Sequence, residues 1–383
     1  EDEPLAATFS WVVEPEFVVA DAGFSVTLWE TESGSDPAVE PSVAPRFPAT
    51  GTEALPVDAT PRSLSLVLAP FEYDVPGCHT IVEPTDEDVE RLAEYLYMLL
   101  PLQGIEIVVL ETTRIVQPIT IHEEILNRVV SRRGGSSAAS GTFYAGLIDF
   151  CEPIDAGGSA FELMTPPTAA DDPLRALWVR WRPDDPDRTN YVLGHELGHS
   201  LGRGHVRCPD TTPPLVERGY PDPEGRLALP GWGTIDEAWR DPTTHFDIMS
   251  YCAPAWTSGW GWNNLDPVLT AITSWGAQDH AAAQGEALVG MRTADGVVEQ
   301  WTRVHGYTHS IDAGRAELSP TVTAEITLDN GSRIVMPAHV RSVADSEYTA
   351  VVVPLPDAAP ATLTLVLRED GVVGRAYTVG SSG

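Results

Sequence analysis

Residues 195–205 read His195-Glu196-Leu197-Gly198-His199-Ser200-Leu201-Gly202-Arg203-Gly204-His205, which is the spacing HExxHxxGxxH. Residues four apart lie on the same face of a helix, so His195 and His199 can direct two imidazole rings at one metal ion. Glu196 stays on the same side of that helix, close enough to reach a metal-bound water molecule. The stretch therefore predicts a helix that carries two metal ligands and a general base.

The end of this helix predicts a third ligand. Gly202 permits the left-handed backbone that ends a helix and turns the chain back, and the turn would bring His205 to the same ion. Three neutral imidazoles with one open position suit Zn²⁺, so we expect one catalytic zinc ion. The Asp and Glu residues form no EF-hand-like loop, and structural Ca²⁺ therefore has no support in the sequence.

Two other interpretations of the histidines remain. His199 and His205 could be ordinary helix-end residues that favour the helix dipole, but this explains neither His195-Glu196 nor the joint spacing. A purely structural zinc site is the second, although such sites usually have four protein ligands and no use for the adjacent Glu.

Outward from this helix, residues 63–276 alternate between strands and helices. This order favours an α+β domain with a mixed, mainly parallel sheet covered by helices. The predicted strands are Ser63–Leu68, Ile105–Glu111, Thr142–Phe150, Ala160–Met164 and Leu177–Trp181, and the predicted helices are Thr85–Leu100, Ile121–Arg132, Thr189–Leu201 and Pro267–Trp275.

Both flanks read as β-structure. Residues 1–62 contain short alternating runs, Thr8–Val13 and Phe24–Trp29, which predict a small β-module or arm. Residues 277–383 contain apolar runs at the spacing of a β-sandwich, with a turn at Asp329-Asn330-Gly331. The 383 residues are too many for one ordinary core, so we expect three domains: 1–62, 63–276 and 277–383.

Composition excludes several functions. The 56 acidic residues exceed the 23 basic ones by 33, and such a field repels nucleic acids and anionic membrane surfaces. No apolar run approaches the roughly 20 residues of a membrane span. The chain contains no lysine, which fits either adaptation to salt or a GC-rich genome.

A second motif, Asp247-Ile248-Met249-Ser250-Tyr251-Cys252, follows the zinc motif. Together the two resemble the signature of the metzincin zinc proteases, which combine this zinc motif with a later Met-turn. The resemblance implies that Met249 forms an apolar floor under the zinc ligands. It also implies that Tyr251 lies beside the zinc and stabilises the oxyanion, as in the astacin-like and serralysin-like branches.

Residues 63–276 are similar to the catalytic domain of secreted bacterial proteases related to the StcE-like mucin-degrading group. The matching segments are Glu94–Tyr97, Gly202–Cys208, Gly219–Pro221, Gly231–Gly233 and Met249–Cys252. The resemblance implies a five-stranded sheet and cleavage of extracellular, including O-glycosylated, proteins. It also implies that the strand with Ala160, Phe161 and Glu162 pairs with extended substrate, and that Trp232 lines a substrate pocket. On sequence alone, an ordinary edge strand and a loop anchor are equally good interpretations.

Four cysteines are present, an even number that fits either disulfides or reduced core residues. Given the resemblance, we expect Cys78–Cys151 after neighbouring strands and Cys208–Cys252 near the zinc, in a secreted protein. The first residues, Glu1-Asp2-Glu3-Pro4, do not read as a signal peptide, so we expect that an export signal has been removed.

These observations predict a secreted, monomeric zinc endopeptidase in which Glu196 assists the attack of zinc-bound water on a protein or glycoprotein substrate. One alternative is a catalytically silent metzincin-like protein that binds glycoproteins. Another is a zinc amidase that acts on non-peptide bonds, which would share every residue of the site.

Overall fold

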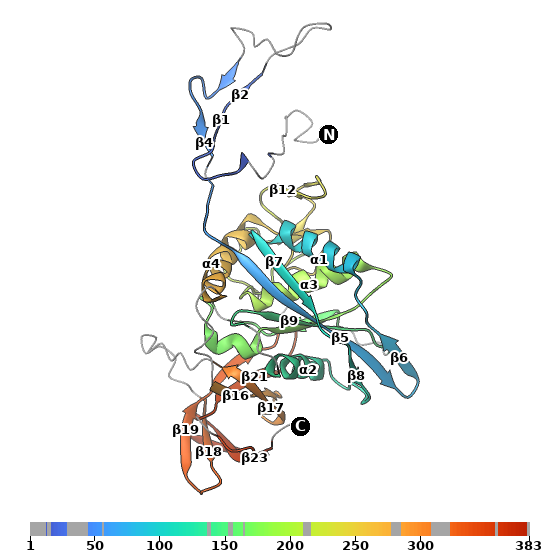
Figure 1. Ribbon diagram of the computed structural model, residues 1–383, viewed down its shortest axis with the longest axis vertical. Coiled ribbons are helices and arrows are strands. Elements are labelled where there is room, and N and C mark those ends of the chain that lie inside the picture. Colours follow the sequence, from blue (N-terminus) through green and yellow to red (C-terminus); the bar gives the residue numbers. More distant parts are fainter. Residues whose placement is uncertain are drawn as a thin grey trace. The chain divides into compact units, whose positions relative to one another are not determined.

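The computed structural model describes residues 13, 17–28, 45–55, 57–135, 139–151, 156–163, 165–209, 216–276, 285–307, 322–356 and 359–380 (Figure 1). The chain forms two compact units, residues 1–61 and 62–383. Of the segments predicted from sequence, residues 8–12, Trp29 and Met164 lie outside the described ranges.

The described part of the first unit consists of two short antiparallel ladders. Strand β1 (Gly23–Phe24) pairs with β4 (Glu53–Ala54), and β2 (Val26–Thr27) pairs with β3 (Arg46–Phe47).

The second unit is built on a mixed sheet. In it β7 (Gly104–Val109), β5 (Ser63–Val75), β9 (Phe143–Ile148) and β11 (Ala176–Arg180) run parallel, and β10 (Gly158–Ala160) is antiparallel to β11 at the edge. The far half of β5 also pairs with β6 (Cys78–Ile81) and β8 (Thr113–Ile115), which makes seven strands. The expected α+β class with a mixed sheet is thus confirmed.

The two extra strands follow from the length of β5, which has 13 residues. Its predicted end at Leu68 is wrong, because Pro70, a poor strand residue, is accommodated opposite Leu147 of β9. Beyond the proline the alternation continues with Phe71, Tyr73 and Val75, all buried, and this half of the strand provides the edges for β6 and β8.

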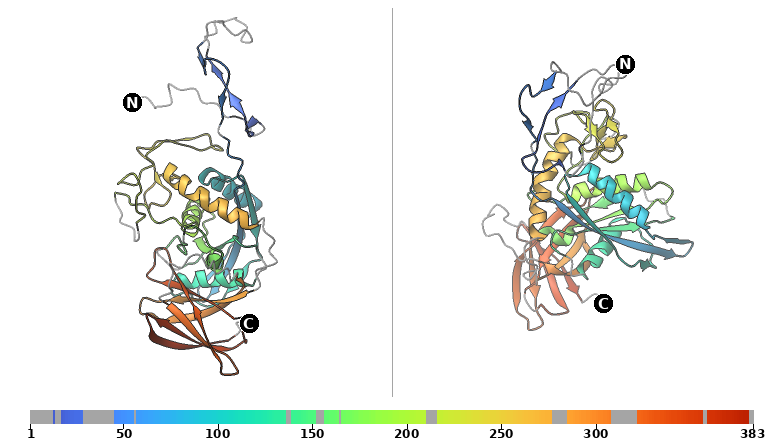
Figure 2. Two further views of the ribbon diagram at one scale, coloured as in Figure 1. Left: turned by 90° about the vertical axis from the view of Figure 1, so that its left-hand side faces the viewer. Right: turned by 45° about the horizontal axis from the view of Figure 1, so that its top comes forward.

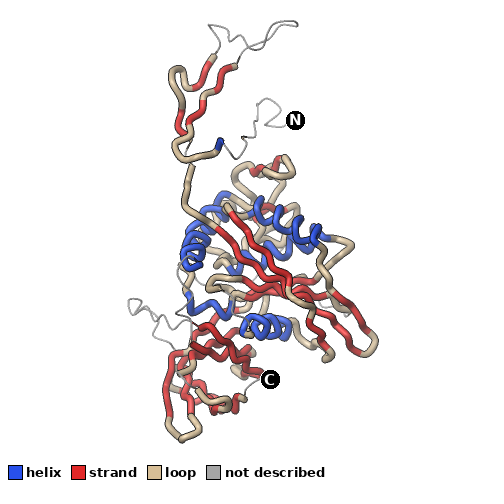
Figure 3. Tube along the Cα trace, viewed as in Figure 1, coloured by secondary structure: helices blue, strands red, loops and turns tan. Residues whose placement is uncertain are grey.

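Helices cover both faces of the sheet. Alternate residues of β5 divide between two cores: Leu64 and Leu66 face α1 (Asp86–Leu99), α3 (Pro186–Ser200) and α4 (Gly259–Gly276), whereas Val67 and Phe71 face α2 (Glu123–Gly134). A 3₁₀ helix, Ala169–Leu174, precedes β11. Figure 3 shows these helices against the strands.

Two helices begin earlier than their sequence predicted, for identifiable reasons. The side chain of Asp185 caps α3 by accepting from Arg188 N, and Pro186 occupies the first turn. The Ser258 hydroxyl accepts from Gly261 N at the start of α4, so Pro267 lies within that helix instead of at its beginning.

The C-terminal part is a sandwich of two four-stranded antiparallel sheets. Their orders are β17-β16-β21-β20 and β19-β18-β22-β23. The strands are β16 (Gly285–Arg292), β17 (Val298–Tyr307), β18 (Val322–Thr327), β19 (Arg333–Pro337), β20 (His339–Ser342), β21 (Thr349–Pro354), β22 (Leu363–Glu369) and β23 (Val372–Val379).

The first of these sheets is buried on both sides. Ala287 and Val289 of β16 belong to the core around α2, whereas Leu288, between them, belongs to the interior of the sandwich. The approach is close, because a Cβ added to Gly134 of α2 would lie 2.8 Å from Val304 Cγ1. The sandwich is therefore a third layer of the second unit, next to α2 (Figure 2).

Four short strands shape the loops around the end of α3. Strand β12 (Gly231–Trp232) pairs with β13 (Trp239–Arg240), and β14 (Phe246–Asp247) pairs with β15 (Ala255–Trp256). The second of these pairs flanks residues 248–254, which contain the predicted Met-turn.

Candidate metal centre

The helix α3 positions two histidines and then ends as its sequence predicts. His195 and His199 lie on its last two turns, and Gly202 adopts φ +87°, the left-handed conformation that turns the chain back. His205 then lies beside them, with its carbonyl accepting from Glu217 N at 2.7 Å.

The three imidazoles converge on one point. His199 Nε2 lies 3.2 Å from His195 Nε2 and 3.1 Å from His205 Nε2. Four ligands at about 2.0–2.1 Å from a tetrahedral zinc ion are about 3.3 Å apart, so these separations suit one shared ion. The buried group His195, His199 and His205 could therefore bind a metal ion.

The hydrogen bonds of the rings also favour a cation. His195 Nδ1 lies 2.8 Å from Ile248 O and His199 Nδ1 lies 2.9 Å from Arg203 O. Because a carbonyl only accepts, both Nδ1 atoms carry the proton and both Nε2 atoms of the neutral rings present lone pairs. Burial lowers the pKa of His195 to about 4 and that of His199 well below its usual value, so both rings stay neutral. Facing lone pairs repel unless a cation lies between them.

Glu196 is buried beside the histidines. Its side chain has no hydrogen-bond partner for Oε2 among the described residues, and burial raises the pKa of Glu196 well above its usual value. A Cβ on Gly158 of β10 would lie 2.8 Å from Glu196 Cγ, so the glycine makes room for this side chain. A buried carboxylate oxygen without a partner is costly unless something binds to it. Beside three converging imidazoles, it indicates a site for a metal ion and a reacting molecule.

Met249 lies against α3, the helix that carries His195 and His199. Its side chain is fully buried, and its backbone carbonyl accepts from Val206 N, next to the third histidine, at 2.9 Å. A Cβ on Gly198 would lie 2.3 Å from Met249 Sδ. The thioether thus packs against the helix backbone between His195 and His199.

This contact predicts opposite behaviour for two glycines of α3. Ala in a helix interior is normally up to about 1 kcal/mol better than Gly, but Gly198→Ala must displace Met249, and overpacking costs about 1–3 kcal/mol. A Cβ on Gly194 would lie 3.0 Å from Leu99 Cδ1 and 3.4 Å from Tyr95 Cε1, a much less severe overlap. We expect the Gly198 variant to be less stable than the Gly194 variant by about 1–2 kcal/mol in urea unfolding. Equal stabilities would contradict the packing described.

A buried ion pair holds the loop that follows α3. Arg203 donates to Glu217 Oε2 at 2.8 Å and lies 3.5 Å from Asp247 Oδ1. Asp247 in turn accepts from Met249 N at 2.9 Å. The same charged network therefore connects the third histidine's loop with the Met-turn.

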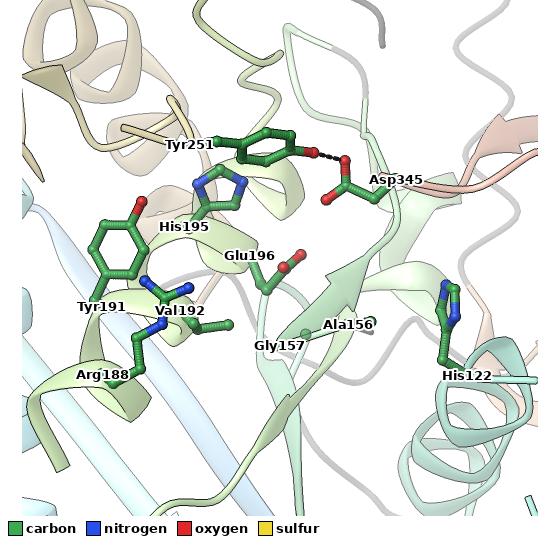
Figure 4. A pocket seen from close by; sticks show the side chains of 11 residues that line it. His122, Ala156, Gly157, Arg188, Tyr191, Val192, His195, Glu196, Tyr251 and Asp345 are labelled. Atoms are coloured by element: carbon green, nitrogen blue, oxygen red, sulfur yellow. Dashed lines mark hydrogen bonds between the residues drawn. The ribbon is translucent and has the colours of Figure 1, made fainter. Parts of the chain in front are cut away.

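The metal centre opens into a cleft of about 420 Å³. Figure 4 shows the Tyr251 hydroxyl pointing toward Asp345, with His195 and Glu196 close by and Tyr191 and Arg188 at earlier positions of α3. The Tyr251 hydroxyl lies 3.1 Å from His205 Nε2 and also donates to Asp345 Oδ1. Burial and the neighbouring Asp345 raise the pKa of Tyr251, so its hydroxyl keeps the proton that it donates.

Both predicted disulfides are present. Cys78 is bonded to Cys151 and Cys208 to Cys252. The second joins the segment after His205 to the segment after Met249, and so connects two of the loops that form the metal centre. Disulfides fit a protein that matures in an oxidising compartment.

The expected substrate edge has a different neighbour. The Ala160 carbonyl accepts from Ala344 N at 2.8 Å, Glu162 N donates to Ser342 O at 3.0 Å, and Phe161 forms an antiparallel bridge with Val343. Ala160 and Phe161 are fully buried. The edge strand expected to pair with substrate is therefore covered here by the chain's own β20–β21 loop. Trp232, 36% exposed, lies in the β12–β13 hairpin and is not among the residues that line the cleft.

Sequence reasoning missed two residues of the site. Tyr191 precedes His195 by one helical turn, and its hydroxyl donates to Ser250 O at 2.9 Å, so helical spacing could have indicated it. Asp345 comes from the sandwich, and no local pattern could have placed it beside His205.

No protein-family model and no curated protein matches the chain. None of the helices within the described ranges is long and apolar enough to cross a membrane. Function is therefore inferred from the chemistry of the metal centre.

Proposed function

We propose that the protein is a zinc-dependent endopeptidase of the metzincin type. One observation carries the proposal. The Nε2 atoms of His195 and His205 lie 3.2 and 3.1 Å from that of His199, beside a glutamate whose Oε2 has no hydrogen-bond partner in the described part of the chain, at the wall of a cleft. A structural metal site has no need for the glutamate or for the cleft.

His195, His199 and His205 would hold the zinc ion. When bound, zinc polarises a scissile carbonyl and lowers the pKa of water to about 7. Glu196 would take the proton from the attacking water and return it to the leaving amine. Tyr251 donates its hydroxyl hydrogen to the oxyanion, and the hydrogen bonds from Nδ1 of His195 and His199 fix the rings.

The substrates we propose are extracellular proteins, with O-glycosylated, mucin-like proteins as the extension that the sequence resemblance suggests. The two disulfides support a secreted protein. Mass-spectrometric mapping of cleavage sites in a mixed digest of proteins and mucins tests this substrate class. If cleavage is confined to unglycosylated segments, the proposal that mucins are substrates is wrong, but the proposal of a peptidase still holds.

A second function is favoured by one specific contact. Asp345 Oδ1 lies 3.1 Å from His205 Nε2, so four protein ligands could close the metal centre. A closed centre is typical of structural zinc, and the protein would then be a catalytically silent binding protein. Hydrolysis that depends on Glu196 distinguishes the peptidase from this alternative.

The zinc assignment predicts that His199→Ala loses the metal. We expect one equivalent of zinc per native chain, and much less in the variant after dialysis, because two nitrogen ligands cannot hold the ion as tightly as three. Inductively coupled plasma mass spectrometry measures the metal content.

The control for this experiment is His79→Ala. His79 belongs to the other described group with metal-ligand chemistry, Glu72, Asp74 and His79, which lies outside the cleft. Arg114 already forms ion pairs with both carboxylates of that group. We expect His79→Ala to keep its zinc. If this variant lost zinc while His199→Ala retained it, the metal would be bound by Glu72, Asp74 and His79 and not by the three histidines.

A further inference from the structure

The loop between β20 and β21 enters the cleft of the metal centre. Within it Ala344 N donates to Ala160 O, and Ser159 Oγ donates to Ala344 O at 3.2 Å. Val343 is 1% exposed and Ala344 is fully buried. The loop thus adds one short antiparallel segment to the edge of the sheet, which is how an extended peptide would bind there.

The same loop places a carboxylate at the histidines. The Asp345 backbone adopts φ +60°, a left-handed conformation in which Asp is enriched among the residues with side chains. Its Oδ1 lies 3.1 Å from His205 Nε2 and accepts from the Tyr251 hydroxyl. The ligand atoms of Asp345 and the three histidines all lie within 4.8 Å of one another. The carboxylate therefore lies where a fourth metal ligand would lie, and it also engages the hydroxyl proposed for the oxyanion.

One further contact anchors the loop outside the cleft. Ser346 Oγ donates to a Glu123 carboxylate oxygen on α2, and within the loop it accepts from Tyr348 N at 3.1 Å. The loop is also short, because Ser342 and Thr349 already pair as β20 and β21. It is thus held on both sides of Asp345, which limits how far the carboxylate can move while the loop keeps these contacts.

We propose that Asp345 is a built-in fourth ligand of the metal ion and that residues 342–345 occupy the substrate edge, so that this structure is the latent form of the peptidase. The inference rests on the proposed function and adds its regulation. Substrate and the loop compete for the same sheet edge, the same metal position and the same Tyr251 hydroxyl. Activity therefore requires the loop to leave, and only the fraction of molecules with the loop displaced turns over substrate.

The experiment compares the native chain with Asp345→Ala, Asp345→Asn and Glu347→Gln, each loaded with Co²⁺ or Zn²⁺. Glu347 is exposed in the same loop and controls for the loss of one negative charge. The visible absorption of Co²⁺ reports its ligands without any turnover. We expect both Asp345 variants to change this spectrum, and Glu347→Gln to keep it.

With zinc bound, we expect Asp345→Ala to raise kcat/KM for an unstructured protein substrate by at least about tenfold, since it enlarges the competent fraction. If the Ala variant folds poorly, the Asn variant tests the same rise in kcat/KM, because it keeps the side-chain volume and a hydrogen-bond acceptor. Hydrogen exchange at Ala344 N and Glu162 N should become faster in both. A Co²⁺ spectrum unchanged in both variants would overturn the fourth ligand, and lower activity with unchanged exchange would overturn latency.

Failure of the peptidase function gives a different pattern. If no variant cleaves any protein but the Asp345 variants still change the Co²⁺ spectrum, the fourth ligand is supported and the centre is a closed structural site. The spectrum thus decides the ligand, and turnover decides the function.

Discussion

Glu196→Gln should lower kcat by about 10²–10⁴ while the protein keeps its zinc and its fold. The amide has nearly the same volume as the carboxylate but cannot take a proton from water. Glu196 is 3% exposed, and its Oε2 has no hydrogen-bond partner among the described residues, so the substitution breaks no hydrogen bond of that atom. Steady-state kinetics on a peptide substrate measure the effect, best in the Asp345→Ala background, where turnover is expected to be highest.

The matched control is Asp187→Asn, an exposed carboxylate in the first turn of the same helix. We expect this variant to retain full turnover, because its side chain is remote from the metal ligands along α3. Turnover of Glu196→Gln within about threefold of its parent would remove Glu196 as the general base, and the hydrolysis would then need another proton acceptor.

Tyr251→Phe should lower kcat by about 10²–10³ and leave KM nearly unchanged. The hydroxyl lies 3.1 Å from His205 Nε2, so it could donate to an oxyanion on a metal ion held by the three histidines. The ground-state carbonyl makes little use of that donor, so the loss concerns the transition state. The measurement is again made in the Asp345→Ala background, since in the native chain the substitution also releases the hydrogen bond to Asp345.

Tyr220→Phe controls for the loss of a hydroxyl. The Tyr220 hydroxyl donates to Arg226 O at 2.7 Å outside the cleft, so this variant should lose only about 1 kcal/mol of stability. If Tyr251→Phe behaves in the same way, with turnover near that of its parent, then Tyr251 only positions the Asp345 loop and has no part in the chemistry.

The local part of the metal centre could be predicted from sequence. Residues four apart on a helix share a face, and a glycine permits the turn after it, so His195, His199 and His205 are linked by spacing alone. The Met249 and Cys208–Cys252 expectations followed from the resemblance in two of these short segments. The Cys78–Cys151 pair followed from the strand order that the resemblance implies, because each cysteine comes after a strand expected to be a neighbour of the other.

What could not be predicted depends on contacts between distant segments. Nothing near Asp345 in sequence indicates that it lies beside His205, because β20 and β21 read only as sandwich strands. The Ala160–Glu162 edge was expected to face substrate for the same reason: its neighbour, residues 342–344, is about 180 residues away along the chain. The length of β5 was underestimated because a proline within a strand normally signals its end.

One sheet of the sandwich packs against α2 on one face and against the other sheet on its other face, so the C-terminal region cannot be separated from the rest of the second unit without exposing apolar surface. A deletion or fusion with its breakpoint near residue 276 would uncover the α2 surface at Ser131 and Gly134, which contact Thr302 and Val304 of β17. It would also give the excised piece an uncovered apolar face at Ala287 and Val289. Apolar faces of this kind promote aggregation. A breakpoint near residue 61 would instead fall between the two compact units. A C-terminal swap made in the laboratory would therefore have to carry α2 together with the sandwich.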